Sequence, residues 1–335
     1  MIPPPDRSRR GAAGPRAVYG TRGGQAAETS QRAPPRLAWA RPAVAPAARM
    51  PAGARPCGEG VTMPTPIRAH VIVGGFPPGQ HAGHDMDYAR LRILQALQAN
   101  ENVHATVSSD YTECHRWIRD CQLLVTYVAG PFADDHEAGV IRDWIADGGR
   151  WLALHGSTGG KAARLDSEGT RRRMVKASYH DALGGFFLTH PPIREFQVDV
   201  RDRDHVLTHN LPESFRIKDE PYMIEVLHPE TRVLLSTAEV PPPPAETQEL
   251  YGGDTSLLPD GKSRALGFVR EIGVGSIAYV APGHCHSPLT NMQPIVDASI
   301  SPDGAPPLRF RGPWETEPYE TLVGNAIAWG TGVEG

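Results

Sequence analysis

Histidines and acidic residues occur where several predicted strands or turns end. The five positions are Gly83-His84-Asp85, Leu154-His155-Gly156, Thr189-His190, Asp219-Glu220 and Gly283-His284. An open α/β sheet binds its ligands beyond the carboxyl ends of its strands. If these strands form one sheet, the side chains therefore gather at one mouth. Imidazoles beside a carboxylate can move protons there, because the histidine pKa lies near neutrality.

The predicted catalytic residues are His155, Glu220 and His284. His155 ends a buried strand, so its ring either faces the cleft or hydrogen-bonds a neighbouring carbonyl. The glycine before His284 lets the backbone approach a ligand closely. Asp219 and Glu220 are adjacent, and repulsion between their carboxylates can raise one pKa toward the working pH of a general acid or base. We expect Glu220 to be that group.

Five further residues are predicted to bind the substrate: His84, Asp85, His190, Asp219 and Tyr222. His84 and Asp85 come at the mouth of a helix, where free backbone amides favour a polar or anionic ligand group. His190 precedes two prolines, a fixed turn that could point its ring into the cleft. Structural alternatives remain: Asp85 could cap the helix, backbone bonds could hold His190, and Asp219 could bond its own backbone.

The same histidines could hold a divalent metal such as zinc, which binds neutral imidazole nitrogen and carboxylate oxygen. The candidate ligands are His84, His155 and His284. Their spacing puts no two of them on one helix, so a metal site would be assembled from separate loops. Cys285, next to His284, also allows a thiol hydrolase, although a small buried cysteine is commoner than a reactive one.

The elements that must position these residues begin with alternating strands and helices. Strands are predicted at residues 70–75, 103–107, 123–128 and 150–154, and helices at 88–97, 112–120 and 134–149. The last helix is the best defined, because Asp134 with Glu137 makes a capping box and Gly148-Gly149 supplies the stop. This alternation predicts an α/β fold with a doubly wound, mainly parallel sheet and helices on both faces.

Beyond residue 185, strand-like stretches follow one another with few helices between them. They lie at residues 195–200, 222–227, 232–237, 264–270 and 276–281, before a closing helix at 319–329. We expect them to extend or flank the sheet. Residues 241–244 and 252–261 are rich in proline or glycine and are predicted as surface loops.

Residues 1–62 differ in composition from the rest of the chain. They contain ten Arg, no Lys, three acidic residues and ten Pro. Too little apolar periodicity is present to offset the entropy of ordering, so we predict a disordered extension followed by an α/β domain at residues 63–335. A translation start placed too far upstream, with Met63 as the natural beginning, is favoured over a native tail or a targeting peptide.

Charge and apolar content limit the partners. Subtracting the residues of the extension from totals of 34 basic and 38 acidic residues leaves the domain near −11, which argues against nucleic acid. No stretch approaches the roughly 18 apolar residues that span a membrane. The four cysteines lack C-x-x-C spacing, as expected for reduced thiols in a cytoplasmic protein. A small molecule is the expected partner, and a homo-oligomer stays open.

The motifs over residues 67–332 resemble, in order and spacing, the ThuA-like (trehalose utilisation) family. The matching pieces are Gly83-His84-Asp85, Gly148-Gly149 to Leu154-His155-Gly156, Gly184-Gly185-Phe186-Phe187 through His190, Asp204-His205 to His209-Asn210-Leu211, Asp219-Glu220-Pro221-Tyr222, Gly273 to Tyr279 with Gly283-His284, and Ala326 to Gly330. The resemblance implies a class I glutamine amidotransferase-like (flavodoxin-like) fold and a role in carbohydrate metabolism. Amidotransferases carry a nucleophilic cysteine where this chain has His155, so that activity should be absent.

The first hypothesis is therefore an enzyme that acts on a sugar or keto-sugar, such as a trehalose-related disaccharide. His155 and His284 would bind or polarise a sugar oxygen, and Glu220, helped by His84, would move a proton. Hydrolysis, elimination and isomerisation all stay open. Aromatic residues such as Tyr222 could stack on sugar faces. The alternative is a non-catalytic sugar-binding or regulatory module that kept the pocket.

Overall fold

The computed structural model describes residues 65–165 and 172–332. The predictions for residues 1–62 lie outside this part of the chain. The first described elements alternate strands and helices, as predicted. They are β1 (Ile67–Gly75), α1 (Met86–Gln98), β2 (Val103–Ser108), α2 (Cys114–Ile118), β3 (Leu123–Ala129), α3 (Asp135–Ala146), β4 (Arg150–Leu154) and the 3₁₀ helix η1 (His155–Thr158).

Strands dominate the elements that follow. They are β5 (Lys161–Arg164), β6 (Arg172–Val175), α4 (Ser178–Leu183), β7 (Gly185–Thr189), β8 (Arg194–Val200), η2 (Val206–Thr208), β9 (Ser214–Asp219), β10 (Met223–Val226), β11 (Arg232–Thr237), α5 (Ala245–Tyr251), β12 (Arg264–Ile272), β13 (Gly275–Val280) and α6 (Glu317–Thr331). β5 and α5 were not predicted from the sequence. β5 is mostly exposed and α5 buries no residue, so neither has the periodic apolar residues that mark a strand or a helix. None of the described helices is long and apolar enough to cross a membrane.

Nine strands form the central sheet, in the order β2-β1-β3-β4-β13-β12-β11-β8-β9. The first five strands of this order are parallel. The remaining neighbours pair antiparallel, so the fold is mixed α/β and the predicted parallel arrangement holds for one half of the sheet. The other half is antiparallel where strands return directly, as at residues 273–274 between β12 and β13, without a crossover helix.

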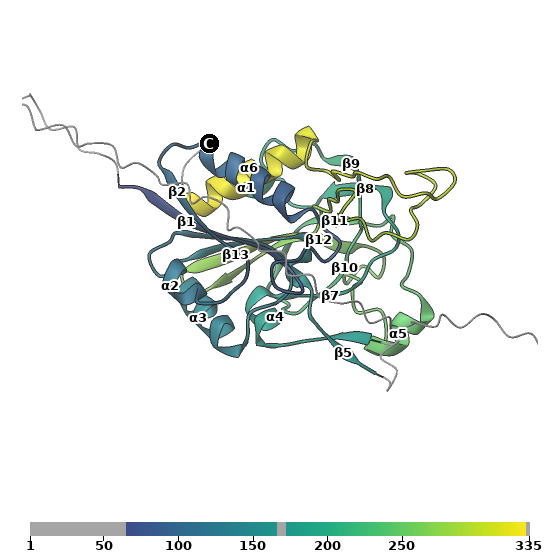
Figure 1. Ribbon diagram of the computed structural model, residues 1–335, viewed down its shortest axis with the longest axis horizontal. Helices are drawn as coiled ribbons and strands as arrows, with labels where there is room; N and C mark the ends of the chain where they lie inside the picture. The colour runs from purple at the N-terminus through teal and green to yellow at the C-terminus, as the bar shows by residue number, and fades with distance from the viewer. Residues whose placement is uncertain (1–64, 166–171, 333–335) are drawn as a thin grey trace, which may run out of the picture. The chain divides into compact units, whose positions relative to one another are not determined.

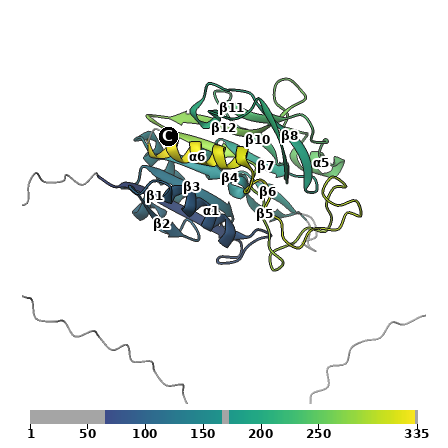
Figure 2. The same ribbon diagram turned by 90° about the horizontal axis from the view of Figure 1, so that it is seen from above.

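Helices cover both faces of the sheet (Figure 1). α1 and α6 contact each other over one face and lie side by side in Figure 2, whereas α2, α3 and α4 form a contacting row over the other. β3 is therefore buried on both faces along residues 123–128, which explains its continuously apolar sequence. The core extends from Ala69 in β1 to Ile327 in α6.

Two helices begin at residues whose side chains cap them. Asp85 Oδ1 accepts the Tyr88 N–H at 3.2 Å at the start of α1, and Asp134 Oδ1 accepts the Glu137 N–H at 2.9 Å at the start of α3. These bonds satisfy amides that have no partner within the helix. The Glu137 carboxylate contacts His115 instead of closing the expected capping box.

The parallel half of the sheet brings several strand ends to one edge. β1 lies between β2 and β3, so the chain changes direction across the sheet at β1 and β3. This is the switch point of the strand order 2-1-3-4-5, beside which open α/β sheets bind ligands. The loops after β1, β4 and β13 all leave the sheet at this edge.

Gly74→Ala should destabilise the fold. Gly74 lies near the end of β1, where a Cβ atom would be 1.7 Å from Ser109 O. The backbone shift needed to relieve this clash should cost about 2 kcal/mol or more. Thermal and urea unfolding of the purified variant measure the loss.

Gly139→Ala is the matched control for this substitution. A Cβ at Gly139, in α3, meets no atom within 4 Å, and alanine favours a helix over glycine by about 1 kcal/mol. This variant should therefore be more stable than the wild type. Equal stabilities of the two variants would contradict the close approach of β1 to Ser109.

Candidate active site

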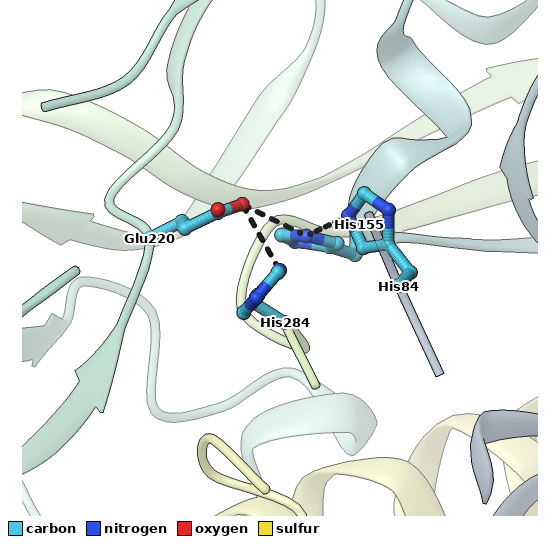
Figure 3. Close-up of side chains that lie close together, drawn as sticks. All are labelled: His84, His155, Glu220 and His284. Atoms are coloured by element: carbon cyan, nitrogen blue, oxygen red, sulfur yellow. Dashed lines mark hydrogen bonds and ion pairs between the residues drawn. The ribbon is translucent and has the colours of Figure 1, made fainter. Parts of the chain in front are cut away.

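Four of the predicted site residues lie together where strands end (Figure 3): His84, His155, Glu220 and His284. Each directs one side-chain nitrogen or carboxylate oxygen toward the others, and these four atoms all lie within 4.8 Å of one another. The residues come from four separate connections, after β1, β4, β9 and β13. None is more than 8% exposed. Side chains far apart in the sequence thus form one buried polar centre.

His155 is the first residue of η1, at the sharp turn that directly follows β4. Its backbone φ of +44° lies in the left-handed region that residues other than glycine rarely adopt. The next residue, Gly156, leaves no room for a side chain, because a Cβ there would be 2.8 Å from Val128 O. Such strain persists only where the surrounding structure imposes it, and it clusters at functional sites.

The His155 ring presents a single nitrogen to the centre. Its Nδ1 donates to Ala281 O at 2.8 Å, and the ring of Tyr222 packs against it with a centroid separation of 4.2 Å. The other nitrogen, Nε2, lies 3.1 Å from His84 Nε2 and 3.5 Å from Glu220 Oε2. The ring is therefore fixed from outside and faces polar atoms inside.

His84 follows Gly83 in the loop that leads into α1. Its Nδ1 donates to Ala82 O at 2.9 Å, which leaves Nε2 to face the centre. Burial, together with the neighbouring His284 and His155, holds the pKa of His84 well below 6.5. The ring is therefore neutral at pH 7.

Glu220 supplies the carboxylate of the centre. Its Oε2 lies 3.5 Å from His155 Nε2 and 3.2 Å from His284 Nδ1, and the Gln293 amide donates to Oε1. Burial alone raises the pKa of Glu220, but His190, His284 and His155 outweigh it and hold the pKa well below 4.5. Glu220 is therefore ionised.

Asp219 carries the raised pKa that the sequence led us to expect at Glu220. Burial raises the pKa of Asp219 to about 7, so the prediction for Glu220 was wrong. The Asp219 carboxylate accepts the backbone N–H groups of Gly283 at 2.6 Å, His284 at 3.0 Å and Glu220 at 2.8 Å. It ties the connections after β9 and β13 together and positions both Glu220 and His284.

A second histidine, His286, contacts the side of the His284 ring that faces away from the centre. His284 Nε2 lies 3.0 Å from His286 Nδ1, and His286 Nε2 donates to Pro307 O at 2.8 Å. Burial lowers the pKa of both rings below 6.5. The inner nitrogen, His284 Nδ1, has no hydrogen-bond partner among the described residues, although Glu220 is close to it.

His190 and Tyr222 lie at the edge of the centre. The His190 ring stacks on Tyr222 at a centroid separation of 5.5 Å, and its Nε2 is 3.8 Å from Glu220 Oε1. Its Nδ1 donates to Pro191 O at 2.9 Å. With 29% of its side chain exposed, His190 is the most accessible of the predicted site residues.

Two residues near the centre direct their side chains elsewhere. Asp85 caps α1 and its Oδ2 accepts a hydrogen bond from Arg311 at 2.7 Å, which matches the structural alternative. Cys285 Sγ lies 3.5 Å from Asp85 O, and burial raises the pKa of its thiol to about 12. Such a thiol stays protonated at neutral pH and is a poor nucleophile.

Two residues that contact the centre, His286 and Gln293, were not among the predicted site residues. A signal existed for His286, because residues two apart in an extended segment point to the same side, and His286 follows His284 by two. Gln293 belongs to the long connection between β13 and α6. Its local sequence carries no mark of a bond to Glu220, which depends on how that connection folds back.

Comparison with known proteins identifies a family that matches this chain. The ThuA family, described as trehalose utilisation, matches residues 78–295. This range is more than half of the chain and includes all four residues of the centre. No curated protein matches the chain.

Two solved structures of putative ThuA-like proteins are similar to this chain. A putative ThuA-like protein from Bacteroides uniformis ATCC 8492 has a TM-score of 0.51 at 16% identity, over 83% of this chain and 95% of that one. One from Parabacteroides merdae ATCC 43184 has a TM-score of 0.48 at 16% identity, over 80% and 91%. The resemblance seen in the motifs is confirmed, and the chain belongs to the ThuA (trehalose utilisation) family.

Proposed function

We propose that this protein is an enzyme of carbohydrate metabolism that acts on a sugar or keto-sugar through His155, Glu220 and His284. The convergence of three imidazoles and one ionised carboxylate in a buried centre carries the proposal. The family description points to a trehalose-related disaccharide as the substrate. Hydrolysis, elimination and isomerisation each require a proton to move, which this set of groups can support.

Glu220 is the group best suited to accept that proton. Its carboxylate is ionised, and the nitrogens of His155 and His284 lie within 3.5 Å of Oε2. These two imidazoles would bind a sugar by accepting hydrogen bonds from its hydroxyl groups, with His84 beside them. Asp219 would act through its bonds to the backbone of Glu220 and His284, as a positioning residue.

The substrate would approach past His190. His190 is partly exposed, whereas Tyr222 is buried and its ring packs against those of His155 and His190, so Tyr222 would hold these two rings in place. The Gln293 amide bonds Glu220 Oε1, and a sugar hydroxyl could replace it with the same type of bond.

We also infer that the domain has a doubly wound, class I glutamine amidotransferase-like fold. The strand order β2-β1-β3-β4-β13 supports this, because it follows the flavodoxin-like order. The strained turn at His155 resembles a nucleophile elbow in position, but an imidazole replaces the thiol that glutamine hydrolysis needs. A cytoplasmic location fits the free Cys114, Cys121 and Cys285.

Glu220→Gln should abolish most turnover. The amide cannot accept a proton, so kcat on a keto-derivative of trehalose should fall about 10²- to 10⁴-fold, the usual contribution of a positioned acid or base. Sugar binding should remain measurable, because glutamine keeps the size of the side chain. Product formation by mass spectrometry, across trehalose and its keto-derivatives, provides the measurement.

Glu195→Gln on β8 is the control, since it makes the same change in a surface ion pair with Arg216 on β9. It should leave turnover unchanged. Thermal stabilisation of the wild type by these sugars without any product would contradict the proposal and favour a non-catalytic sugar-binding module.

His190→Ala should raise KM about tenfold with a smaller effect on kcat. His190 lies at the accessible edge, so its loss should remove about one hydrogen bond to the substrate, or roughly 1.4 kcal/mol. Steady-state kinetics measure both constants, with the exposed His104→Ala on β2 as the control. A large loss of kcat at unchanged KM would instead place His190 among the groups that move the proton.

A further inference from the structure

We propose that His84, His155, Glu220 and His284 together bind one divalent transition-metal ion, of which Zn²⁺ fits the donors well, and that His286 positions His284 for it. This inference does not depend on the proposed function, because metal binding requires no sugar. It rests on where the hydrogen atoms of the buried rings must lie.

Backbone carbonyls determine which nitrogens of two rings carry hydrogen. A carbonyl oxygen only accepts, so the nitrogen facing it must be the donor. His84 Nδ1 faces Ala82 O at 2.9 Å, and His155 Nδ1 faces Ala281 O at 2.8 Å. In their neutral forms the two rings therefore direct the lone pairs of both Nε2 atoms at each other across 3.1 Å. This contact is repulsive unless a cation is shared.

Two successive hydrogen bonds determine which nitrogen of the third ring, His284, carries hydrogen. Pro307 O accepts from His286 Nε2, which leaves His286 Nδ1 as an acceptor. His284 Nε2 must therefore be the donor in the 3.0 Å bond between the two rings. His284 Nδ1 then has no hydrogen, yet it faces another acceptor, Glu220 Oε2, across 3.2 Å. This accounts for its lack of a partner within residues 65–165 and 172–332.

The spacing of the inner atoms suits a small ion. Zinc bonds of about 2.0–2.1 Å to histidine nitrogen and carboxylate oxygen, at tetrahedral angles, place neighbouring ligand atoms about 3.3 Å apart. Three of the six distances between inner atoms are 3.1, 3.2 and 3.5 Å, and all six are within 4.8 Å. Acceptors on the outer nitrogens orient metal-binding histidines and raise their basicity. Here these acceptors are Ala82 O, Ala281 O and His286 Nδ1.

A single proton held between these side chains in place of a metal ion would give fewer of the inner atoms a partner. Placed on His155 Nε2, it could bond either His84 or Glu220, but His284 Nδ1 would still face Glu220 without a hydrogen between them. A divalent ion contacts all four inner atoms at once and offsets the carboxylate charge. If the proposed function also holds, the ion would supply Lewis-acid polarisation of a sugar oxygen.

Metal titration of the full chain without substrate tests the proposal. Protein stripped with a chelator should bind one equivalent of Zn²⁺ in competition with a chromophoric chelator. Co²⁺ should bind at the same stoichiometry and produce visible ligand-field absorption. His155→Ala and His284→Ala should each abolish the Co²⁺ spectrum and most of the Zn²⁺ affinity.

Variants of His286 separate positioning from folding. His286→Leu removes the acceptor for His284 Nε2 and should weaken Zn²⁺ binding about 10- to 100-fold. His286→Asn keeps an acceptor near the place of Nδ1 and should restore most of the affinity. His180→Ala is the control, because it removes a buried histidine that bonds Gly159 O outside the centre. Circular dichroism of each variant reports whether it folds.

Failure of the folded wild type to bind Zn²⁺ or Co²⁺ would overturn the metal site. One-equivalent binding that survives in both His155→Ala and His284→Ala would also overturn it, by placing the ion elsewhere. Wild-type affinity in a folded His286→Leu would refute the positioning role. Turnover assays remain a separate measurement, so loss of this proposal leaves the carbohydrate proposal to be judged on its own substrates.

Discussion

One carboxylate and three imidazoles share a volume that is almost closed to water, and this constraint organises the surrounding structure. A buried polar atom without a partner costs about 1–3 kcal/mol, so the outer nitrogens of the rings must be satisfied by the protein. Two backbone carbonyls and His286 do so. Each outer nitrogen of the three rings thereby keeps its hydrogen, so the inner nitrogens can only accept hydrogen bonds. These nitrogens and the Glu220 carboxylate repel one another unless a positive charge lies between them.

The same constraint imposes backbone strain at His155 and the burial of a carboxylate at Asp219. His155 keeps a φ of +44°, which turns the chain sharply enough for its ring to reach both Ala281 and His84. Asp219 is fully buried, and its carboxylate is compensated by three backbone N–H groups. Buried neighbouring strands on both sides of β4 hold these turns in place, because a turn on an exposed edge would relax.

Strand ends were predictable from the sequence, whereas the contacts made beyond them were not. Apolar runs marked β1, β3, β4 and β13, and parallel pairing then brings the residues after β1, β4 and β13 to one edge. Short exposed strands such as β5 carry no such pattern. Which acid has the raised pKa depends on the groups around each carboxylate, and so Asp219 and Glu220 could not be ranked locally. Asp85 was equally compatible with a ligand site and a helix cap.

The electrostatics of the centre also narrow the chemistry that it can perform. Thiol catalysis is disfavoured, because the elbow position holds His155 and the Cys285 thiol has a pKa of about 12. Removal of a proton beside the carbonyl of a keto-sugar would leave negative charge on an oxygen, next to the existing charge of Glu220. Imidazole nitrogens that carry no inward hydrogen cannot stabilise that oxygen. A cation in this centre would stabilise that oxygen, whereas simple binding of a sugar needs none.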